Sequence, residues 1–524
     1  MKRQGIPFLS IPALLTICCC SQSPNPETTE SLTSLQGPAL SGSQTYVLSG
    51  SAINARQVTI NGLSLDTSAA TAISDSAASI FASDYSSGTL ISNAAAGAPD
   101  YTIDFSSSGT LVSNIYYGGD IQIVSKQYLA NPIYQALLGN IKIDIIRFPA
   151  GQERVKYDKA ADAATILTPA DKANGYQYLL TGVDVANYVN LCKNLDIKAD
   201  PEFNLFTNDP AMWTSLVDQV VNGLGYPLEY MAVGNEPDIN PTGNWTYFQA
   251  SDMTGALNAY MTRYQTYAAS IRKIKTGITF ILGELANNSD PKISQILDQI
   301  LPQAKANPPG AFSVHWYLLG DWGQSPLAPD YPSINHLVIS GNSGVNIRSL
   351  SALKSTMRNH LDSNTKLVIG EWATSWSATP GGDDVQDTLA TAIYTAEVME
   401  YGKVLGIDSM QYFGISDPSI FTDWYTSLIV ENGGSFSARP QYYVRMMYKY
   451  AWGNTMIPVP GGQTDDFSIY ASKDGSNDYI MLINRTPGTS FAKTIKMITA
   501  GNPSGINAEV LLLPKSVAVI RLPR

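Results

Sequence analysis

Two glutamates stand out in the sequence because each follows a strand-like stretch and opens a polar one. Glu236 comes after the apolar residues 230–233, in Gly-Asn-Glu-Pro-Asp, and Glu371 comes after residues 366–369, in Gly-Glu-Trp. An apolar run that stops at a polar segment indicates a buried strand that ends in a loop. Two carboxyls presented over one crevice could act as a proton donor and a nucleophile, the pair that two-step displacement at an acetal carbon requires.

The segment between these glutamates, and on either side of it, alternates strand-like and helix-like patterns. We predict eight strands, which open at or contain Val112, Ile141, Ile197, Tyr230, Ile278, Phe312, Leu367 and Ile407. Eight such alternations in about 300 residues are typical of an α/β (β/α)8 TIM barrel. A doubly wound sheet has the same alternation and stays open as an alternative. In a barrel, Glu236 would end the fourth strand and Glu371 the seventh, so both would face one mouth.

The flanks of this segment have the composition of strands and turns. Residues 44–108 are rich in small and hydroxyl side chains with short alternating runs, and residues 441–524 separate strand-like runs by turn signals. We expect both flanks to combine into an accessory antiparallel β-sandwich. The expected layout is a signal segment at 1–20, a flexible tether at 21–43, N-terminal strands at 44–108, a barrel domain at 109–440 and a sandwich domain at 441–524.

The first residues have the layout of an export signal. Lys2 and Arg3 precede an apolar segment at 6–17, which ends in Cys18-Cys19-Cys20. We expect a bacterial lipoprotein signal with lipidation at Cys20 and a protein held at the cell envelope. Ordinary secretion with cleavage nearby is the alternative, and it predicts an extracellular protein. A lipid anchor is the one membrane contact expected, because no later stretch has the roughly 18 consecutive apolar residues of a spanning helix.

Composition and motifs argue against several other classes of protein. The net charge of -11 and the pI near 4.8 argue against a nucleic-acid partner, which would require a basic face. His315, His336 and His360 lack the spacing of zinc ligands. The glycine pair in Pro380-Gly381-Gly382 does not follow a strand and is typical of a turn rather than of a phosphate loop. We therefore expect no metal and no cofactor.

Several side chains at predicted strand ends could support the two glutamates. The Asn235 amide could bind a sugar hydroxyl beside the reacting carbon. Arg147, at the end of the second strand, could keep the nucleophile ionised by charge pairing, although a purely structural ion pair is as good an interpretation. At the end of the sixth strand, Tyr317 could donate to Glu371. His315 could line the sugar site or be an ordinary buried histidine.

Further candidates are aromatic rings and two more carboxyls. Rings near strand ends could stack on sugar faces, and we select Trp372 for substrate contact, with Trp322, Trp376 and Tyr412 as further candidates. Glu202, after the third strand, is expected to contact substrate or its immediate supports. Glu284 ends the fifth strand in the same Gly-Glu context as Glu371, and it would be the nucleophile if the strand count were wrong.

These motifs resemble those of clan A retaining glycoside hydrolases, which have Asn-Glu-Pro after the fourth barrel strand and a glutamate after the seventh. Within the clan, residues 145–151 and 233–237 and the terminal sandwich look most like glycoside hydrolase family 79, the β-glucuronidase and heparanase group. The resemblance covers residues 112–524. It implies a TIM barrel with a sandwich, Glu236 as acid/base and Glu371 as nucleophile. The bulky Trp372 departs from the small residue expected after the nucleophile, which leaves the sugar open.

The resemblance therefore predicts an enzyme that hydrolyses O-glycosidic bonds of an oligo- or polysaccharide, with a glucuronide as one substrate. An arabinofuranosidase, xylosidase or glucanase of the same clan is the alternative within the enzyme class. A surface lipoprotein that binds glycans without turning them over is the alternative outside it. Two carboxyls so close that one must stay protonated argue against a simple binding protein.

Overall fold

The structure is a computed structural model, and it describes most of the chain from residue 98 onward together with four short strands before it. The described residues are 44–49, 57–60, 63–66, 91–93, 98–151, 154–162, 164–239, 244–286, 292–318, 341–342, 347–374, 389–418, 427–432, 435–486, 489–512 and 514–524. The predicted signal segment, the tether and Cys20 lie outside these residues.

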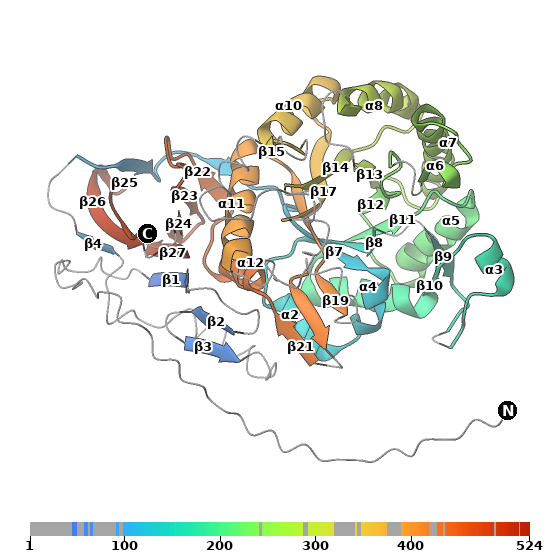
Figure 1. Cartoon of the computed structure of the whole chain (residues 1–524), viewed down its shortest axis with the longest axis horizontal. Coiled ribbons are helices and arrows are strands. Elements are labelled where there is room, and N and C mark those ends of the chain that lie inside the picture. The colour runs from blue at the N-terminus through green and yellow to red at the C-terminus, as the bar shows by residue number, and fades with distance from the viewer. Residues whose placement is uncertain are drawn as a thin grey trace, which may run out of the picture.

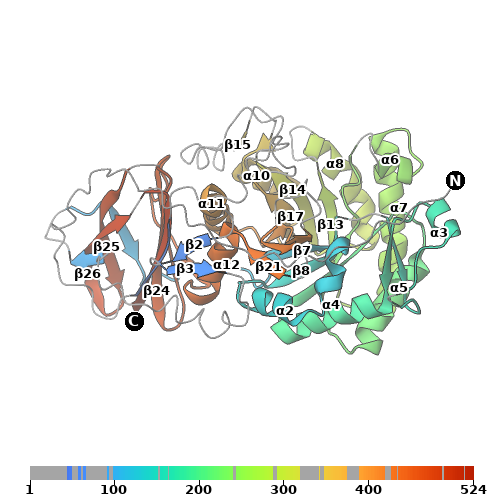
Figure 2. The same cartoon turned by 60° about the horizontal axis from the view of Figure 1, so that its bottom comes forward.

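Eight parallel strands close into a barrel, which confirms the predicted TIM-barrel fold and excludes the open sheet. In chain order the strands are β7 (Tyr117–Gln122), β8 (Ile145–Ala150), β11 (Lys198–Phe203), β12 (Tyr230–Val233), β13 (Thr279–Leu285), β14 (Ala311–Tyr317), β17 (Lys366–Ala373) and β18 (Ser409–Phe413). Each strand pairs with its neighbour in the sequence of barrel strands, and β18 pairs with β7 to close the ring. Figures 1 and 2 show the helices arranged around this ring.

Helices surround the barrel, and the longer ones bury apolar residues. They are α2 (Pro132–Gly139), α3 (Pro169–Ala173), α4 (Gly182–Leu195), α5 (Pro210–Asp218), α6 (Asn244–Tyr247), α7 (Met253–Ile271), α8 (Lys292–Ile300), α10 (Leu350–His360), α11 (Leu389–Leu405) and α12 (Pro440–Tyr450). In α7 the buried residues Leu257, Tyr260, Met261 and Tyr264 repeat with helical spacing. Within the described part of the chain, no helix is both long and apolar enough to cross a bilayer.

Local signals explain where these helices begin and end. In α4, Thr181 and Asp184 form a reciprocal capping box at the first turn, and Asp196 ends the helix in the left-handed conformation with a φ of 52°. Shorter elements occupy the loops: 3-10 segments at Ile123–Tyr128 and Leu301–Ala306, a π segment at Gln219–Gly223, and strands β9 (Val155–Asp158), β10 (Tyr178–Thr181), β15 (Gly341–Asn342), β16 (Ile347–Arg348), β19 (Ser416–Pro418), β20 (Ile429–Asn432) and β21 (Ser435–Ala438).

The first barrel strand lies further along the chain than predicted. The strand expected from Val112 begins at Tyr117, and β6 (Thr110–Leu111) pairs instead with β22 of the sandwich. Gly118 and Gly119 lie inside this strand, although a glycine pair is typical of a turn. No larger side chain fits at either position. A Cβ on Gly118 would come within 2.4 Å of Gln411 Cγ, and one on Gly119 within 2.7 Å of Ile415.

A sandwich of two sheets lies beside the barrel (Figure 2). The larger sheet has the order β3 (Leu63–Asp66), β2 (Gln57–Ile60), β1 (Gln44–Ser49), β27 (Ser516–Pro523), β24 (Asn477–Asn484), β23 (Phe467–Lys473), β22 (Thr455–Ile457) and β6. The smaller has β4 (Ile91–Asn93), β26 (Asn502–Leu512), β25 (Phe491–Thr499) and β5 (Tyr101–Asp104). All pairs are antiparallel except β5 with β25. An apolar core that includes Ile103, Ile469 and Met497 fills the space between the sheets.

A buried ion pair joins the sandwich to the barrel. Glu397 of α11 accepts from Arg485 Nη1 at 2.7 Å, and its other oxygen accepts from Ser468 Oγ at 2.8 Å and Tyr470 Oη at 2.6 Å. Both charged side chains are fully buried. Because Arg485 follows β24 and the two hydroxyls belong to β23, this network holds one sheet against a barrel helix.

Candidate active site

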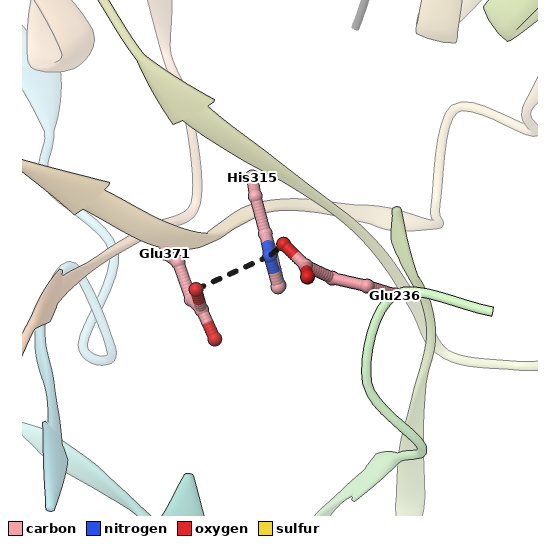
Figure 3. Close-up of side chains that lie close together, drawn as sticks. All are labelled: Glu236, His315 and Glu371. Atoms are coloured by element: carbon pink, nitrogen blue, oxygen red, sulfur yellow. Dashed lines mark hydrogen bonds and ion pairs between the residues drawn. The ribbon is translucent and has the colours of Figure 1, made fainter. Parts of the chain in front are cut away.

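The two predicted catalytic glutamates come together at the mouth of the barrel. Glu236 follows β12, and Glu371 lies near the end of β17. Between them stands His315 of β14, which is in register with Glu371 on the neighbouring strand. Figure 3 shows the three side chains converging from these separate elements. The convergence follows from the barrel, because the C-terminal ends of parallel strands all reach the same face.

The two carboxyls lie close to each other. One oxygen of Glu236, one oxygen of Glu371 and a ring nitrogen of His315 all lie within 4.8 Å of one another. Retaining glycosidases hold their carboxyls about 5 to 5.5 Å apart, whereas inverting ones need about 6.5 to 9.5 Å to admit a water. The Glu236 side chain is 22% exposed and that of Glu371 only 5%. Glu236 is therefore the carboxyl that solvent reaches more easily.

The backbone at Glu236 adopts a conformation that side chains rarely take. Gly234 and Glu236 have φ values of 69° and 46°, and the amide of Glu236 donates to the carbonyl of Glu284 at 2.8 Å. Glu284 has a φ of 42° and follows Gly283, whose φ is 107°. A non-glycine residue in this region costs on the order of 1 kcal/mol or more, and such residues gather at functional sites. Two adjacent strands, β12 and β13, therefore each present a glutamate with a positive φ at this end of the barrel.

Arg147 links the catalytic groups beneath the mouth. Its Nε donates to Glu202 Oε2 at 2.7 Å, and its Nη2 donates to Asn235 Oδ1 at 2.7 Å. Its Nη1 lies 3.3 Å from Glu371 Oε1 and donates to the carbonyl of Gly370 at 3.1 Å. The guanidinium is fully buried. Arg147 therefore contacts the predicted nucleophile, Glu371, and also forms a structural ion pair with Glu202. Its contacts agree with both roles expected from the sequence.

Tyr317 and Arg147 both lie against Glu371. Tyr317 Oη donates to Glu371 Oε2 at 2.8 Å. The pKa of Glu371 lies above its ordinary value. Burial is the largest cause and Glu236 also raises the pKa, whereas His315, Arg147 and Tyr317 lower it. Burial, together with Glu371, also raises the pKa of Tyr317 well above its usual range, so the phenol keeps its proton. Tyr317 is thus placed to donate to an ionised Glu371.

His315 lies in the cluster rather than in an unrelated part of the core. Its Nδ1 is 2.8 Å from Glu236 Oε1, and its Nε2 is 3.0 Å from Glu284 Oε2. Burial lowers the pKa of His315, but Glu371, Glu236 and Glu284 raise it, and the pKa lies well above its ordinary value. Each ring nitrogen thus faces a carboxyl oxygen, on opposite sides of the imidazole.

The structure separates Trp372 from the site. Trp372 has no exposed surface, and its ring packs 5.0 Å from that of Tyr412 and 6.3 Å from that of Tyr394 on α11. Adjacent residues of a strand face opposite sides, so Trp372 points toward the helices because Glu371 points into the mouth. The prediction that Trp372 or Tyr412 contacts substrate is therefore wrong. Trp322 and Trp376 lie outside the described residues.

Two further carboxyls have supporting positions. Glu202, expected to contact the substrate or its immediate supports, is 1% exposed and accepts from Arg147 and from the amide of Gly151 at 3.1 Å, so its contacts are those of a support that orients the guanidinium. Glu284, the alternative nucleophile, is fully buried behind His315 and accepts from Ser313 Oγ at 3.0 Å. An attacking oxygen needs access to the substrate, which Glu284 does not have.

The sequence interpretation missed Asp120 of β7. This carboxyl is fully buried, and neither of its oxygens has a hydrogen-bond partner within the described part of the chain. Burial raises the pKa of Asp120 well above its usual value, Arg147 lowers it, and Glu371 and Glu284 raise it. The strand predicted from Val112 does not coincide with β7, which contains Asp120. A correct position for the first strand would have placed Asp120 among the inward-facing side chains.

Among the described residues, the one group of side chains spaced to hold a metal ion is Glu236, His315 and Glu371. One imidazole and two carboxylates form a ligand set that first-row transition metals accept. His315 Nδ1 and Glu236 Oε1 contact each other at 2.8 Å, so a metal ion between them would have to replace that contact.

The fold is that of known glycoside hydrolase structures. The GH51 arabinofuranosidase from Xanthomonas axonopodis pv. citri aligns with a TM-score of 0.58 at 14% identity, over 80% of this chain and 99% of that one. The 4-O-alpha-L-rhamnosyl-beta-D-glucuronidase from Fusarium oxysporum 12S has a TM-score of 0.60 at 15% identity, over 80% and 100%.

A third structure is CelM2, a bifunctional glucanase-xylanase from a metagenome library, with a TM-score of 0.55 at 14% identity, over 82% and 100%. No protein-family model and no curated protein matches the sequence. At these identities the likeness establishes the shared fold, a TIM barrel with additional β-sheets, and it agrees with the resemblance at the level of the clan.

Proposed function

We propose that the protein is a retaining glycoside hydrolase in which Glu236 is the acid/base and Glu371 the nucleophile. The observation that supports this most directly is the distance of no more than 4.8 Å between their carboxylate oxygens at the ends of the fourth and seventh barrel strands. The different exposure of the two carboxyls supports the division of roles. The fold shared with known glycoside hydrolases supports the reaction class.

In the first step, a Glu371 oxygen attacks the anomeric carbon while the bond to the leaving oxygen breaks. The leaving oxygen takes the electron pair of that bond and receives the proton of Glu236, which gives a glycosyl ester on Glu371. Arg147 and Tyr317 hold the attacking carboxylate, and Arg147 also fixes the orientation of the Asn235 amide. In this proposal the amide binds a sugar hydroxyl next to the reacting carbon.

In the second step, a water oxygen attacks the same carbon, and its proton passes to Glu236. The ester bond breaks and its electron pair returns to Glu371, so the sugar leaves with its original anomeric configuration. Each residue regains its starting charge. Neither step requires a metal or a cofactor.

We propose a glycan containing a β-linked uronic acid as the first substrate to test. The proposal rests on the resemblance of residues 145–151 and 233–237 to family 79, and the neighbour from Fusarium oxysporum is itself named a glucuronidase. The other neighbours are an arabinofuranosidase and a glucanase-xylanase, so arabinofuranosides, xylosides and glucosides belong in the same panel.

The test is hydrolysis of a panel of p-nitrophenyl glycosides, with proton NMR of the first product anomer. We expect turnover of at least one sugar with retention, and a loss of at least about 10³-fold in kcat for Glu371→Ala. A Glu371→Ala protein with full activity would exclude the assignment. A wild-type protein that binds glycans but forms no adduct with a fluorosugar inactivator would support the binding lipoprotein instead.

We also propose that the protein is exported and anchored through a lipid on Cys20. The basic, apolar and cysteine-containing order of residues 2–20 supports this proposal. In a bacterial host, metabolic labelling with an alkyne fatty acid should mark the wild-type protein and leave Cys20→Ala unlabelled. Export without any label would support ordinary secretion.

A further inference from the structure

His315 connects both catalytic carboxyls to a third, buried glutamate. Its Nδ1 lies 2.8 Å from Glu236 Oε1 and 3.3 Å from Glu371 Oε2, while its Nε2 lies 3.0 Å from Glu284 Oε2. A neutral imidazole has one donor and one acceptor, so it cannot donate to carboxylates at both nitrogens. The arrangement suits an imidazolium, whose two N–H groups face anions on both sides.

Glu284 is built into the barrel as a fixed anion. It has no exposed surface, accepts from Ser313 Oγ at 3.0 Å and lies 3.3 Å from Arg147 Nη1. Burial raises the pKa of Glu284, but Arg147 and His315 lower it, and the pKa lies below its ordinary value. Glu284 also packs closely against β17, since a Cβ added to Gly370 would lie 2.1 Å from Glu284 Oε2.

We propose that Glu284 is a positioning residue that keeps His315 doubly protonated, and that the resulting cation turns Glu236 from an acid into a base once Glu371 carries the sugar. This inference rests on the retaining mechanism proposed above. It gives a role to a glutamate that neither donates a proton to the substrate nor attacks it.

The argument depends on how the charges change during the reaction. Before the first step, the anionic Glu371 repels a second negative charge and favours a proton on Glu236. In the glycosyl ester Glu371 is neutral, so this repulsion is gone and the His315 cation stabilises an ionised Glu236. The same ester removes one of the anions that hold the second proton on His315. Glu284 does not react, so its charge persists when the cation is needed.

Every charged or titratable group around the His315 ring affects how strongly the ring keeps its second proton. Carboxyl groups come from the loop after β12, from β13, from β17 and from β7, a guanidinium comes from β8, and a phenol comes from β14 itself. In that order the residues are Glu236, Glu284, Glu371, Asp120, Arg147 and Tyr317. Of these, Glu284 is the one carboxyl that contacts Nε2, on the side of the ring away from the reacting carbon.

Loss of the second proton of His315 should slow the second step of the reaction. The water oxygen forms a bond to the anomeric carbon, the ester bond to Glu371 breaks with its electron pair going to Glu371, and the water proton goes to Glu236. If His315 loses its second proton in the ester, Glu236 faces a neutral ring and binds a proton of its own more tightly. A protonated Glu236 cannot take the proton from water.

The test is Glu284→Gln, which keeps the size and removes the charge. With a dinitrophenyl glycoside of the preferred sugar, whose leaving group needs no acid, we expect a burst of dinitrophenol followed by turnover slowed about 10- to 100-fold. The glycosyl ester should be visible by intact-protein mass spectrometry. Azide should restore turnover, because it attacks without a general base, and the product should be the glycosyl azide.

The matched control is Glu202→Gln, which neutralises another buried carboxyl of the same site that contacts Arg147 rather than His315. It should lose activity without a burst and without rescue by azide. Glu284→Gln with neither burst nor rescue would overturn the inference while the wild-type enzyme still hydrolyses glycosides. A wild-type protein inactive on every glycoside would instead overturn the proposed function.

A second measurement does not depend on the variant folding. The chain has three histidines, so nitrogen-15 NMR of the imidazoles can be assigned with His336→Gln and His360→Gln. In the wild-type protein at pH 7.5, roughly one pH unit above the ordinary histidine pKa, His315 should show two protonated nitrogens. A neutral His315 ring at that pH would overturn the inference.

Discussion

At the scale of single residues, the site depends on which groups stabilise the ionised form of Glu371. Tyr317, Arg147 and His315 all favour its ionised form, whereas burial and Glu236 oppose it. Glu371, the proposed nucleophile, is therefore a buried carboxyl beside three groups that favour its ionised form. Removing one of these donors should raise the pKa of Glu371 more than it lowers the stability of the fold, because each donor side chain also has other packing partners.

We predict that Tyr317→Phe moves the acidic limb of the pH profile of kcat/KM to higher pH. The phenol stabilises ionised Glu371, so its loss raises the pKa of Glu371, and attack requires the ionised form. A hydrogen bond to a charged group contributes about 1.5 to 3 kcal/mol, so kcat should also fall by at least about tenfold. The pH dependence of aryl glycoside hydrolysis measures both. An acidic limb that stays in place would contradict the role given to Tyr317.

At the scale of elements, the strands β13, β14 and β17 can bring their side chains together only because one position stays small. A Cβ on Gly370 would lie 2.1 Å from Glu284 Oε2 and 2.2 Å from Ser313 Oγ. The glycine before the nucleophile is thus required by the neighbouring strands and not by its own backbone.

We predict that Gly370→Ala lowers both stability and activity. The methyl group must push Glu284 and Ser313 out of place, and overpacking of this kind costs about 1 to 3 kcal/mol. Urea denaturation and hydrolysis rates measure the two effects. Gly475→Ala is the matched control, because its Cβ would meet nothing within 4 Å. Gly370→Ala with wild-type activity would show that Glu284 and Ser313 tolerate displacement.

At the scale of the whole molecule, a buried ion pair connects the sandwich to the barrel. Glu397 on α11 and Arg485 after β24 are separated by 88 residues in the chain and form a fully buried pair. Chain segments from both ends of the sequence also share the larger sheet, since β1 pairs with β27. The barrel and sandwich should therefore unfold together.

We predict that Glu397→Gln destabilises the protein by about 3 to 5 kcal/mol, because it leaves the Arg485 cation buried without its partner. The double variant Glu397→Leu with Arg485→Met should recover much of the loss. Chemical denaturation followed by tryptophan fluorescence measures both. Asp218→Asn breaks a half-exposed pair with Lys159 and should change little. A single-variant stability equal to the wild type would show that the two parts are held together otherwise.

Much of this architecture follows from local pattern. Strand and helix periodicity is set by backbone geometry, so the eight alternations and the strand ends that present Glu236 and Glu371 could be predicted. The alternation of side chains along β17 would also have placed Trp372 on the outer face. The first strand begins later than predicted, and it includes Gly118 and Gly119, where Gln411 and Ile415 leave no room for a larger side chain.

The sequence by itself determined the barrel and the two catalytic candidates, because both depend on periods of a few residues. Only the tertiary structure decided what the other carboxyls do. Glu284 and Glu371 share the same Gly-Glu context, yet one lies buried behind His315 and the other faces the mouth. That difference arises from how neighbouring strands are staggered around a closed ring, which places side chains from distant segments within hydrogen-bond distance.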